Sequence, residues 1–295
     1  MKRNFFVFCL ALFGLNVGLA TAAKPPLDRT SRSPNVLMIC VDDLNDWIAC
    51  LGGNAEVKTP NIDALAARGR NFLNAHCAVP VCSPSRVSVM SGLHATTTGS
   101  YELGASYQSI SRLDDVPCLQ EYFKEHGYTT LAGGKVLHHG FTGRLAAAVD
   151  ETLGRKKGGP RPKQQMNWKG AWDWGAFPET DAEMHDFQLA QNAAKALGQD
   201  FDKPFFMSVG LFRPHVPMFV PPRWFDMYDP AKITLPKAPR SDLDDIPDNF
   251  KNMSQIAPTP DEVKETGKWR ALVHAYYASV SFADMCVGEV MKGLD

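Results

Sequence analysis

One short stretch of the sequence places a cysteine beside a proline and an arginine. Cys82 lies two residues before Pro84 and four before Arg86. Proline fits the first turn of a helix, so we expect a helix to begin at Pro84, with Cys82 on the preceding turn and Arg86 one turn inside. Helix N–H groups and a guanidinium both stabilise an anion beside the cysteine. The residues alone leave three readings open: an anion site, a thiol activated by the helix dipole, or a structural cysteine.

Two adjacent carboxylates follow the most apolar stretch of the chain. Asp42 and Asp43 come directly after the run 34–41, which is typical of a strand buried on both faces. Paired acids on a turn are often a solvated cap, but at the end of a buried strand they are costly without a cation. Oxygen ligands favour Ca²⁺, or Mg²⁺, over zinc. We therefore predict a metal site here.

Basic residues follow two further apolar segments. Lys135 and His138 stand in Gly-Lys-Val-Leu-His, and His215 stands in Arg-Pro-His-Val-Pro. A lone lysine or histidine on a loop is usually a surface residue. In α/β folds, however, ligands bind outside the carboxyl ends of the strands, where these three residues are expected. We interpret His94 and His139 as bystanders.

The remaining pattern supplies elements that would position these groups. Apolar runs alternate with amphipathic stretches, which predicts an α/β sandwich with a mostly parallel sheet. Residues 154–163 are interpreted as a solvated cationic loop and 217–260 as a proline-rich loop. The expected strands are 34–41, 128–132 and 204–211; the expected helices are 59–68, 84–91, 118–126, 183–197 and a last one from about 261 to the end.

Composition sets limits on the partners of the chain. Its 295 residues are 44% hydrophobic and 21% charged, with a formal net charge of −1. This is enough chain for one large α/β domain, and the charge balance gives no indication of nucleic acid as a partner. Six cysteines follow residue 22, and their spacing cannot pair them.

The N-terminus has the layout of an export signal. Lys2 and Arg3 precede an apolar run over 5–20, and Ala-Thr-Ala at 20–22 offers a cleavage site. We predict a signal peptide over 1–22 and a catalytic domain over 34–295. The product would be periplasmic or extracellular, or lysosomal in a eukaryote, without a stable membrane anchor.

The motif around Cys82 resembles a known signature. Cys-x-Pro-Ser-Arg followed by Met-Ser-Gly at 90–92 is similar to type I sulfatases, and Asp42-Asp43 stands upstream at the family's spacing. Further segments, such as Thr-Pro-Asn-Ile-Asp at 59–63 and Val-Gly-Leu at 209–211, resemble the iduronate-2-sulfatase branch. The resemblance covers nearly all of 34–295.

This resemblance implies a fold, a cofactor and a chemistry. It implies an alkaline-phosphatase-like α/β fold and oxidation of Cys82 to formylglycine by a formylglycine-generating enzyme. Residue 82, Asp42 and Asp43 would be metal ligands, and the substrate would be a sulfated carbohydrate. The implied catalytic set is Cys82, Arg86, Lys135, His138 and His215, of which Lys135, His138 and His215 would also bind the substrate.

The sequence departs from the family's pattern at its end. A late Asp-His-Gly segment and a following lysine, which complete the metal and sulfate sites in the family, do not occur before residue 295. We therefore expect a fragment that lacks the C-terminal part of the fold, with a poorly anchored last helix, a tendency to aggregate and no turnover. The alternatives are a phosphonate or phosphodiester hydrolase of the same superfamily, a catalytically inactive secreted binding protein and, least supported, a cysteine-thiol hydrolase.

Overall fold

A computed structural model of the chain describes most of the residues that follow the N-terminal segment. The described residues are 33–155, 158–165, 167, 171–239, 244–248 and 258–294. The predicted signal peptide over 1–22 lies outside them. The fold below is that of the unit from Pro34 onward.

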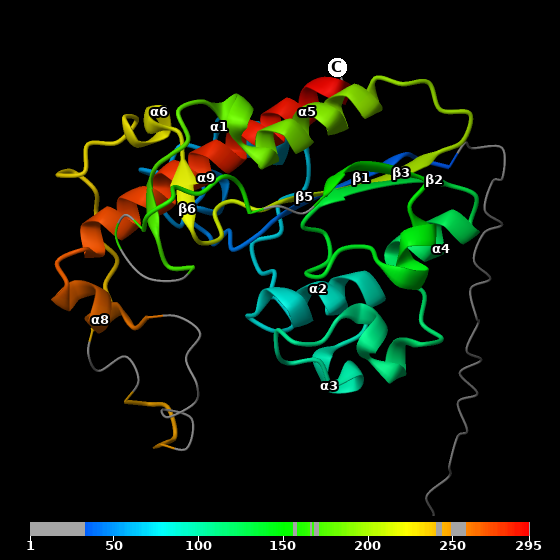
Figure 1. Cartoon of the computed structure of the whole chain (residues 1–295), viewed down its shortest axis with the longest axis horizontal. Helices are drawn as coiled ribbons and strands as arrows, with labels where there is room; N and C mark the ends of the chain where they lie inside the picture. The colour runs from blue at the N-terminus through cyan, green and yellow to red at the C-terminus, as the bar shows by residue number, and fades with distance from the viewer. Residues whose placement is uncertain are drawn as a thin grey trace, which may run out of the picture. The chain divides into compact units, whose positions relative to one another are not determined.

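The centre of this unit is a four-stranded parallel sheet (Figure 1). Its strand order is β1 (Val36–Val41), β5 (Phe205–Leu211), β2 (Thr129–Gly134) and β3 (Glu151–Arg155). Every residue of β5 is buried, as expected of a central strand between two helical layers. The parallel sheet that the sequence predicted is confirmed.

Two expectations about the strands are wrong. β1 is not buried on both faces: it pairs with β5 alone among the described strands, and its residues are half-buried. β3 was not expected, and it takes up the start of the stretch interpreted as a cationic loop. Its sequence, Glu-Thr-Leu-Gly-Arg, has only one large apolar residue, so periodicity could not reveal it.

Helices cover both faces of the sheet (Figure 1). On one face lie α1 (Pro60–Arg68), α5 (His185–Leu197) and α9 (Trp269–Met291); on the other lie α2 (Cys82–Ser91), α3 (Ala95–Thr98) and α4 (Leu119–Glu125). The main core forms where α5 and α9 pack over the strands, and a second core lies beneath α2. Short 3₁₀ turns are η1 (Ala49–Leu51), η2 (Tyr107–Ser109), η3 (Ser111–Leu113), η4 (Gly143–Ala148), η5 (Asp181–Glu183) and η7 (Lys292–Leu294).

The expectation of a poorly anchored last helix is also wrong. Most residues of α9 are buried, including its polar Asp284. The Asp284 carboxylate accepts hydrogen bonds from the backbone N–H groups of Asn61 (3.2 Å) and Ile62 (2.8 Å). These are first-turn amides of α1 that have no partner within their own helix. Helix α9 is thus fixed by polar contacts as well as by its apolar side.

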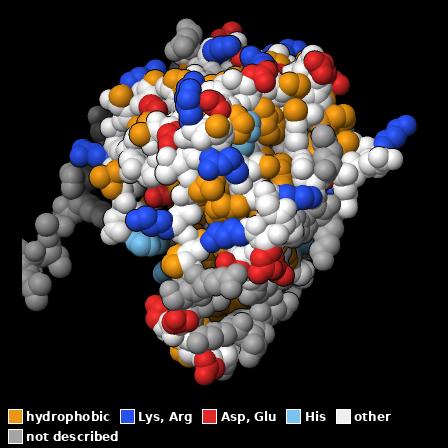
Figure 2. Space-filling model, turned by 90° about the vertical axis from the view of Figure 1, so that its left-hand side faces the viewer, with side chains coloured by type: hydrophobic (Ala, Val, Ile, Leu, Met, Phe, Trp, Pro, Cys, Tyr) orange, Lys and Arg blue, Asp and Glu red, His pale blue; other side chains and the backbone are white. Residues whose placement is uncertain are grey.

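The proline-rich stretch after 216 contains short elements that periodicity did not predict. Strand β6 (Met218–Val220) pairs in parallel with β4 (Trp174–Ala176), and the helix α6 (Pro222–Phe225) follows. The single helix expected from about 261 to the end is instead two helices, α8 (Pro260–Glu265) and α9, separated by residues 266–268. Figure 2 shows charged side chains of both signs scattered around hydrophobic ones on the face that it presents. Within the described residues, no helix combines the length and the apolar character needed to cross a membrane.

Candidate active site

The carboxyl ends of three neighbouring strands bring the predicted residues to one edge of the sheet. Asp42 and Asp43 follow β1, Lys135 follows β2 and His215 follows β5. The backbone N–H of Asp42 donates to Leu211 (3.2 Å), which extends the β1–β5 pairing by one residue and fixes the start of the turn. The expected convergence at this edge is confirmed.

Asp42 is the centre of the charged groups at this edge. It is 3% exposed, and its Oδ1 accepts from Nη2 of Arg86 at 2.6 Å. Its Oδ2 forms an ion pair with Nζ of Lys135. Burial by itself would raise the pKa of Asp42, but the charges of Arg86 and Lys135 outweigh this effect and lower the pKa below its usual value. The carboxylate therefore stays ionised, as a metal ligand must.

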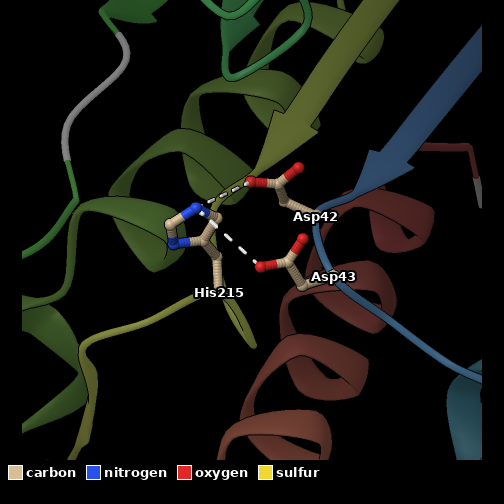
Figure 3. A group of neighbouring side chains, drawn as sticks. All are labelled: Asp42, Asp43 and His215. Atoms are coloured by element: carbon tan, nitrogen blue, oxygen red, sulfur yellow. Dashed lines mark ion pairs between the residues drawn. The ribbon is translucent and has the colours of Figure 1, made fainter. Parts of the chain in front are cut away.

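Asp43 and His215 lie beside Asp42, and the three side chains form one cluster (Figure 3). Nε2 of His215 lies 3.8 Å from Oδ2 of Asp43 and 4.0 Å from Oδ2 of Asp42. Burial, followed by the charge of Lys135, lowers the pKa of His215, so the neutral ring is favoured. Nδ1 of this ring lies 2.5 Å from the carbonyl of Val216 and donates to it. The lone pair of Nε2 consequently faces the two carboxylates.

This cluster has the shape and chemistry of a cation site. One ligand atom from each of Asp42, Asp43 and His215 lies within 4.8 Å of the others. Burial raises the pKa of Asp43, an effect that the neighbouring His215 reduces and the charge of Asp42 increases. Two carboxylates this close are unfavourable unless a positive charge lies between them. Carboxylate oxygens suit Ca²⁺ or Mg²⁺, so the predicted cofactor fits the residues present.

Cys82 is the first residue of α2, two residues earlier than the predicted start at Pro84. Proline is tolerated in the first helical turn because the N–H groups there have no intrahelical partner. Sγ of Cys82 lies 3.2 Å from Nδ1 of His138. Arg86 follows one turn later, where Nη1 donates to the carbonyls of Lys135 and Val136. The arginine is thus held by both a carboxylate and the backbone after β2.

Cys82, the candidate nucleophile, and the two carboxylates of the cluster line one cavity. A hollow of about 400 Å³ is lined by Asp42, Asp43, Cys82 and Arg86, together with apolar side chains. Lys135 and His138 both belong to the segment after β2. Lys135 contacts Asp42, and His138 contacts Cys82. All seven residues predicted from the sequence are therefore close neighbours. His139 is exposed, as expected of a bystander, with Nε2 near the carbonyl of Leu103.

A buried acid that the sequence did not single out holds the loop of His215. Oδ1 and Oδ2 of Asp186 accept from the backbone N–H groups of Phe212 (2.9 Å) and Arg213 (2.7 Å). Nη1 of Arg213 in turn donates to the carbonyl of His215 (3.4 Å). Burial raises the pKa of Asp186 and lowers that of Arg213 to about 10. An acid near a helix start carries no sequence signal for this role.

Fold and site together define an α/β protein of the alkaline-phosphatase-like type with a candidate metal and anion site at the sheet's carboxyl edge. The chain belongs to the sulfatase family, whose model matches residues 34–295. A sulfatase of Formosa agariphila is 36% identical over 317 residues, covering 100% of this chain and 61% of that protein. Iduronate 2-sulfatase of Mus musculus is 29% identical, over 98% of this chain and 56% of its own length.

Solved structures support the fold. Phosphonate monoester hydrolase of Agrobacterium radiobacter superposes with a TM-score of 0.62 at 19% identity, covering 89% of this chain and 59% of that one. A 2-O GAG sulfatase superposes with a TM-score of 0.53 at 22% identity, covering 88% and 54%. At such identities the likeness concerns the fold alone. The chain spans only part of the length of each of these proteins.

Proposed function

We propose that the whole protein hydrolyses sulfate esters of a sulfated sugar, using a nucleophile made from Cys82. The observation that carries this proposal is the position of Cys82. It stands at the first turn of α2, contacts His138 and shares a cavity with Asp42, Asp43 and Arg86. The side chain of residue 82 is thus surrounded by a base (His138), a helix N-terminus and a cationic group (Arg86). Attack on an anionic ester requires these three features.

In the proposed mechanism, the side chain of residue 82 is a formylglycine that adds water to give two hydroxyl groups. As one hydroxyl attacks the sulfur, its proton passes to the neutral His215, which gives it to the oxygen of the leaving alcohol as the bond between that oxygen and sulfur breaks. Arg86 and Lys135 hold the diol and offset charge on the sulfate oxygens. The second hydroxyl then passes its proton to Nδ1 of His138, sulfate leaves, and the aldehyde returns. A divalent cation, bound by Asp42, Asp43 and residue 82, would increase the acidity of the attacking hydroxyl.

The names of the relatives support a sulfated sugar as the substrate class. Iduronate 2-sulfatase is among the relatives matched over almost the whole of this chain. A choline-sulfatase of Rhizobium meliloti, at 27% identity over 90% of this chain, is named for a substrate that is not a sugar, so the proposal follows the relatives that match more of the chain. We propose an iduronate-2-sulfatase-like specificity, in which the ester oxygen belongs to a ring hydroxyl.

A second candidate function is hydrolysis of phosphonate or phosphate esters. The observation in its favour is the pair of cations, Arg86 and Lys135, that contact Asp42 at the edge of the sheet where Cys82 stands. A phosphonate monoester hydrolase shares the fold, with a TM-score of 0.62. The same edge-of-sheet site would serve either ester, because both reactions place negative charge on oxygens near Arg86 and Lys135. The third candidate, a secreted binding protein without catalysis, requires that neither ester is turned over.

Turnover measurements on the whole protein separate these candidates. The protein is produced together with a formylglycine-generating enzyme, and kcat/KM is measured for an aryl sulfate, a sulfated disaccharide, an aryl phosphate and an aryl phosphonate. We expect the highest value for a sulfate ester and none for Cys82→Ala. Cys82→Ser should stop after one turnover, because a sulfated serine has no second hydroxyl. Preference for the phosphonate would establish the second candidate, and no turnover of any ester the third.

Two further parts of the proposal concern maturation and location. We propose that a formylglycine-generating enzyme acts on the segment around Cys82 before it folds, because residues of that motif, such as Ser83 and Arg86, are buried in the fold. We also propose export, based on the signal-like pattern over 1–22.

A further inference from the structure

Asp43 has an unusual backbone conformation at the point where the candidate metal ligands meet. Its φ is +57°, and among the described residues other than glycine it alone has a positive φ. Aspartate tolerates the left-handed region better than most residues, yet the conformation is unfavourable and persists only where surrounding contacts impose it. In this conformation the Asp43 side chain points toward His215 (Figure 3).

A tyrosine on the long C-terminal helix makes the contacts that span this turn. The hydroxyl of Tyr276 donates to the carbonyl of Asp43 at 2.9 Å and accepts from the backbone N–H of Asn45 at 3.0 Å. One hydroxyl thus bonds to both sides of the turn, across more than 230 residues of sequence. The α9 ribbon passes beside Asp43 in Figure 3.

The ring of Tyr276 is itself fixed. It packs edge-on against Trp47, with ring centroids 5.5 Å apart, and the backbone N–H of Trp47 donates to Oδ1 of Asn45 at 3.0 Å. Trp47 therefore contacts both the Tyr276 ring and the Asn45 side chain, next to the turn that the Tyr276 hydroxyl bonds. Neither Tyr276 nor Trp47 offers a side chain to the candidate metal cluster, which consists of Asp42, Asp43 and His215.

We propose that Tyr276 is a positioning residue for the candidate metal centre: its hydroxyl holds Asp43 in the left-handed conformation that directs this carboxylate toward the cation. The proposal rests on the metal site of the proposed function. Helix α9 then has a part in cation binding in addition to its part in the core. A carboxylate that is already held in place loses less conformational freedom when the cation binds. The affinity for the cation therefore depends on the Tyr276 hydroxyl, although this hydroxyl does not touch the cation.

The adjacent tyrosine provides a matched control. Tyr277 is buried, whereas Tyr276 is partly buried, and it too packs edge-on against Trp47, at 5.7 Å. Its hydroxyl instead accepts from Nδ2 of Asn54 (2.5 Å) and contacts Glu56 (3.3 Å), away from the turn at Asp43. Tyr276→Phe and Tyr277→Phe therefore remove the same atom from neighbouring positions, and only the first removes the bonds to Asp43 and Asn45.

The test measures cation binding and backbone protection in the whole protein. Ca²⁺ binding is followed by calorimetry, and hydrogen exchange of the Asn45 amide is measured without added metal. We expect Tyr276→Phe to weaken Ca²⁺ binding about tenfold, which corresponds to the loss of about one hydrogen bond, and to speed exchange at Asn45. Tyr277→Phe should leave both unchanged. Thermal unfolding of each variant shows that it is folded.

The outcomes distinguish failure of this inference from failure of the metal site. Faster exchange at Asn45 together with weaker Ca²⁺ binding supports the inference. Unchanged Ca²⁺ affinity in Tyr276→Phe, or an equal loss in Tyr277→Phe, overturns it while leaving the metal site intact. If the unsubstituted whole protein binds neither Ca²⁺ nor Mg²⁺, the metal site is wrong and the inference falls with it.

Discussion

Sγ of Cys82 lies 3.2 Å from Nδ1 of His138, although 56 residues separate them in the sequence. The contact joins the first turn of α2 to the loop that follows β2. The imidazole of His138 therefore faces the end of the side chain that is oxidised in the proposed maturation. In the proposed mechanism the same imidazole takes a proton from the modified residue 82. The neighbouring His139 packs edge-on against His138 and is exposed, so the two histidines form a natural comparison.

We expect His138→Ala to lower kcat by about 10²–10⁴, the usual contribution of a positioned acid or base, with a smaller change in KM. His139→Ala should have little effect, because this ring does not contact Cys82. Steady-state kinetics with an aryl sulfate provide the measurement. Equal losses from both substitutions would show that the loop as a whole, and not His138 itself, is needed.

The two carboxylates after β1 should respond differently to removal of their charge. Asp42→Asn should weaken Ca²⁺ binding by at least about 10–100-fold, the loss typical of disturbed metal sites. It should also destabilise the fold by about 3–5 kcal/mol, since Arg86 and Lys135 would remain buried without their partner. Asp43→Asn should weaken binding similarly with little loss of stability, because its side chain is 50% exposed.

Calorimetry and thermal unfolding check both parts of this prediction. Asp46→Asn is the control, since Asp46 is exposed and lies outside the candidate cluster. If the Asp42 and Asp43 variants bind as much Ca²⁺ as the parent, the two acids are only a turn cap.

Asp186→Asn should destabilise the protein by about 1–3 kcal/mol, because an amide can accept only one of the two buried N–H bonds that the carboxylate receives. Lys124→Ala provides the contrast. Its ion pair with Asp150 is more than a third exposed on both sides, so its loss should cost about 0–1 kcal/mol. Denaturant unfolding measures both, and similar losses would contradict the role given to Asp186.

The parts of the fold that could be predicted from the sequence are those whose signals are local. The apolar runs before Asp42 and Arg213 predicted β1 and β5, and the parallel arrangement placed their carboxyl ends at one edge. The motif around Cys82 predicted a helix start, which the structure has at Cys82; its role as the nucleophile stays a prediction. Each of these inferences depends on residues that stand next to one another in the chain.

What could not be predicted depends on distant contacts. The edge position of β1 follows from strand order, which periodicity does not encode. The anchoring of α9 comes from Asp284 bonded to α1, and the turn at Asp43 is held by Tyr276. Both side chains stand in an apolar helical pattern where nothing marks them as partners of residues more than 200 positions away.

The central claim, that Cys82 becomes the nucleophile, is tested most directly by the mass of one peptide. The protein is produced together with an active formylglycine-generating enzyme, and the segment spanning Ala78–Arg86 is examined by mass spectrometry. We expect a peptide about 18 Da lighter than the cysteine form, since the carbon that carried the thiol becomes an aldehyde carbon. An unmodified thiol, with the same enzyme converting a control substrate in parallel, would show that Cys82 does not become the nucleophile.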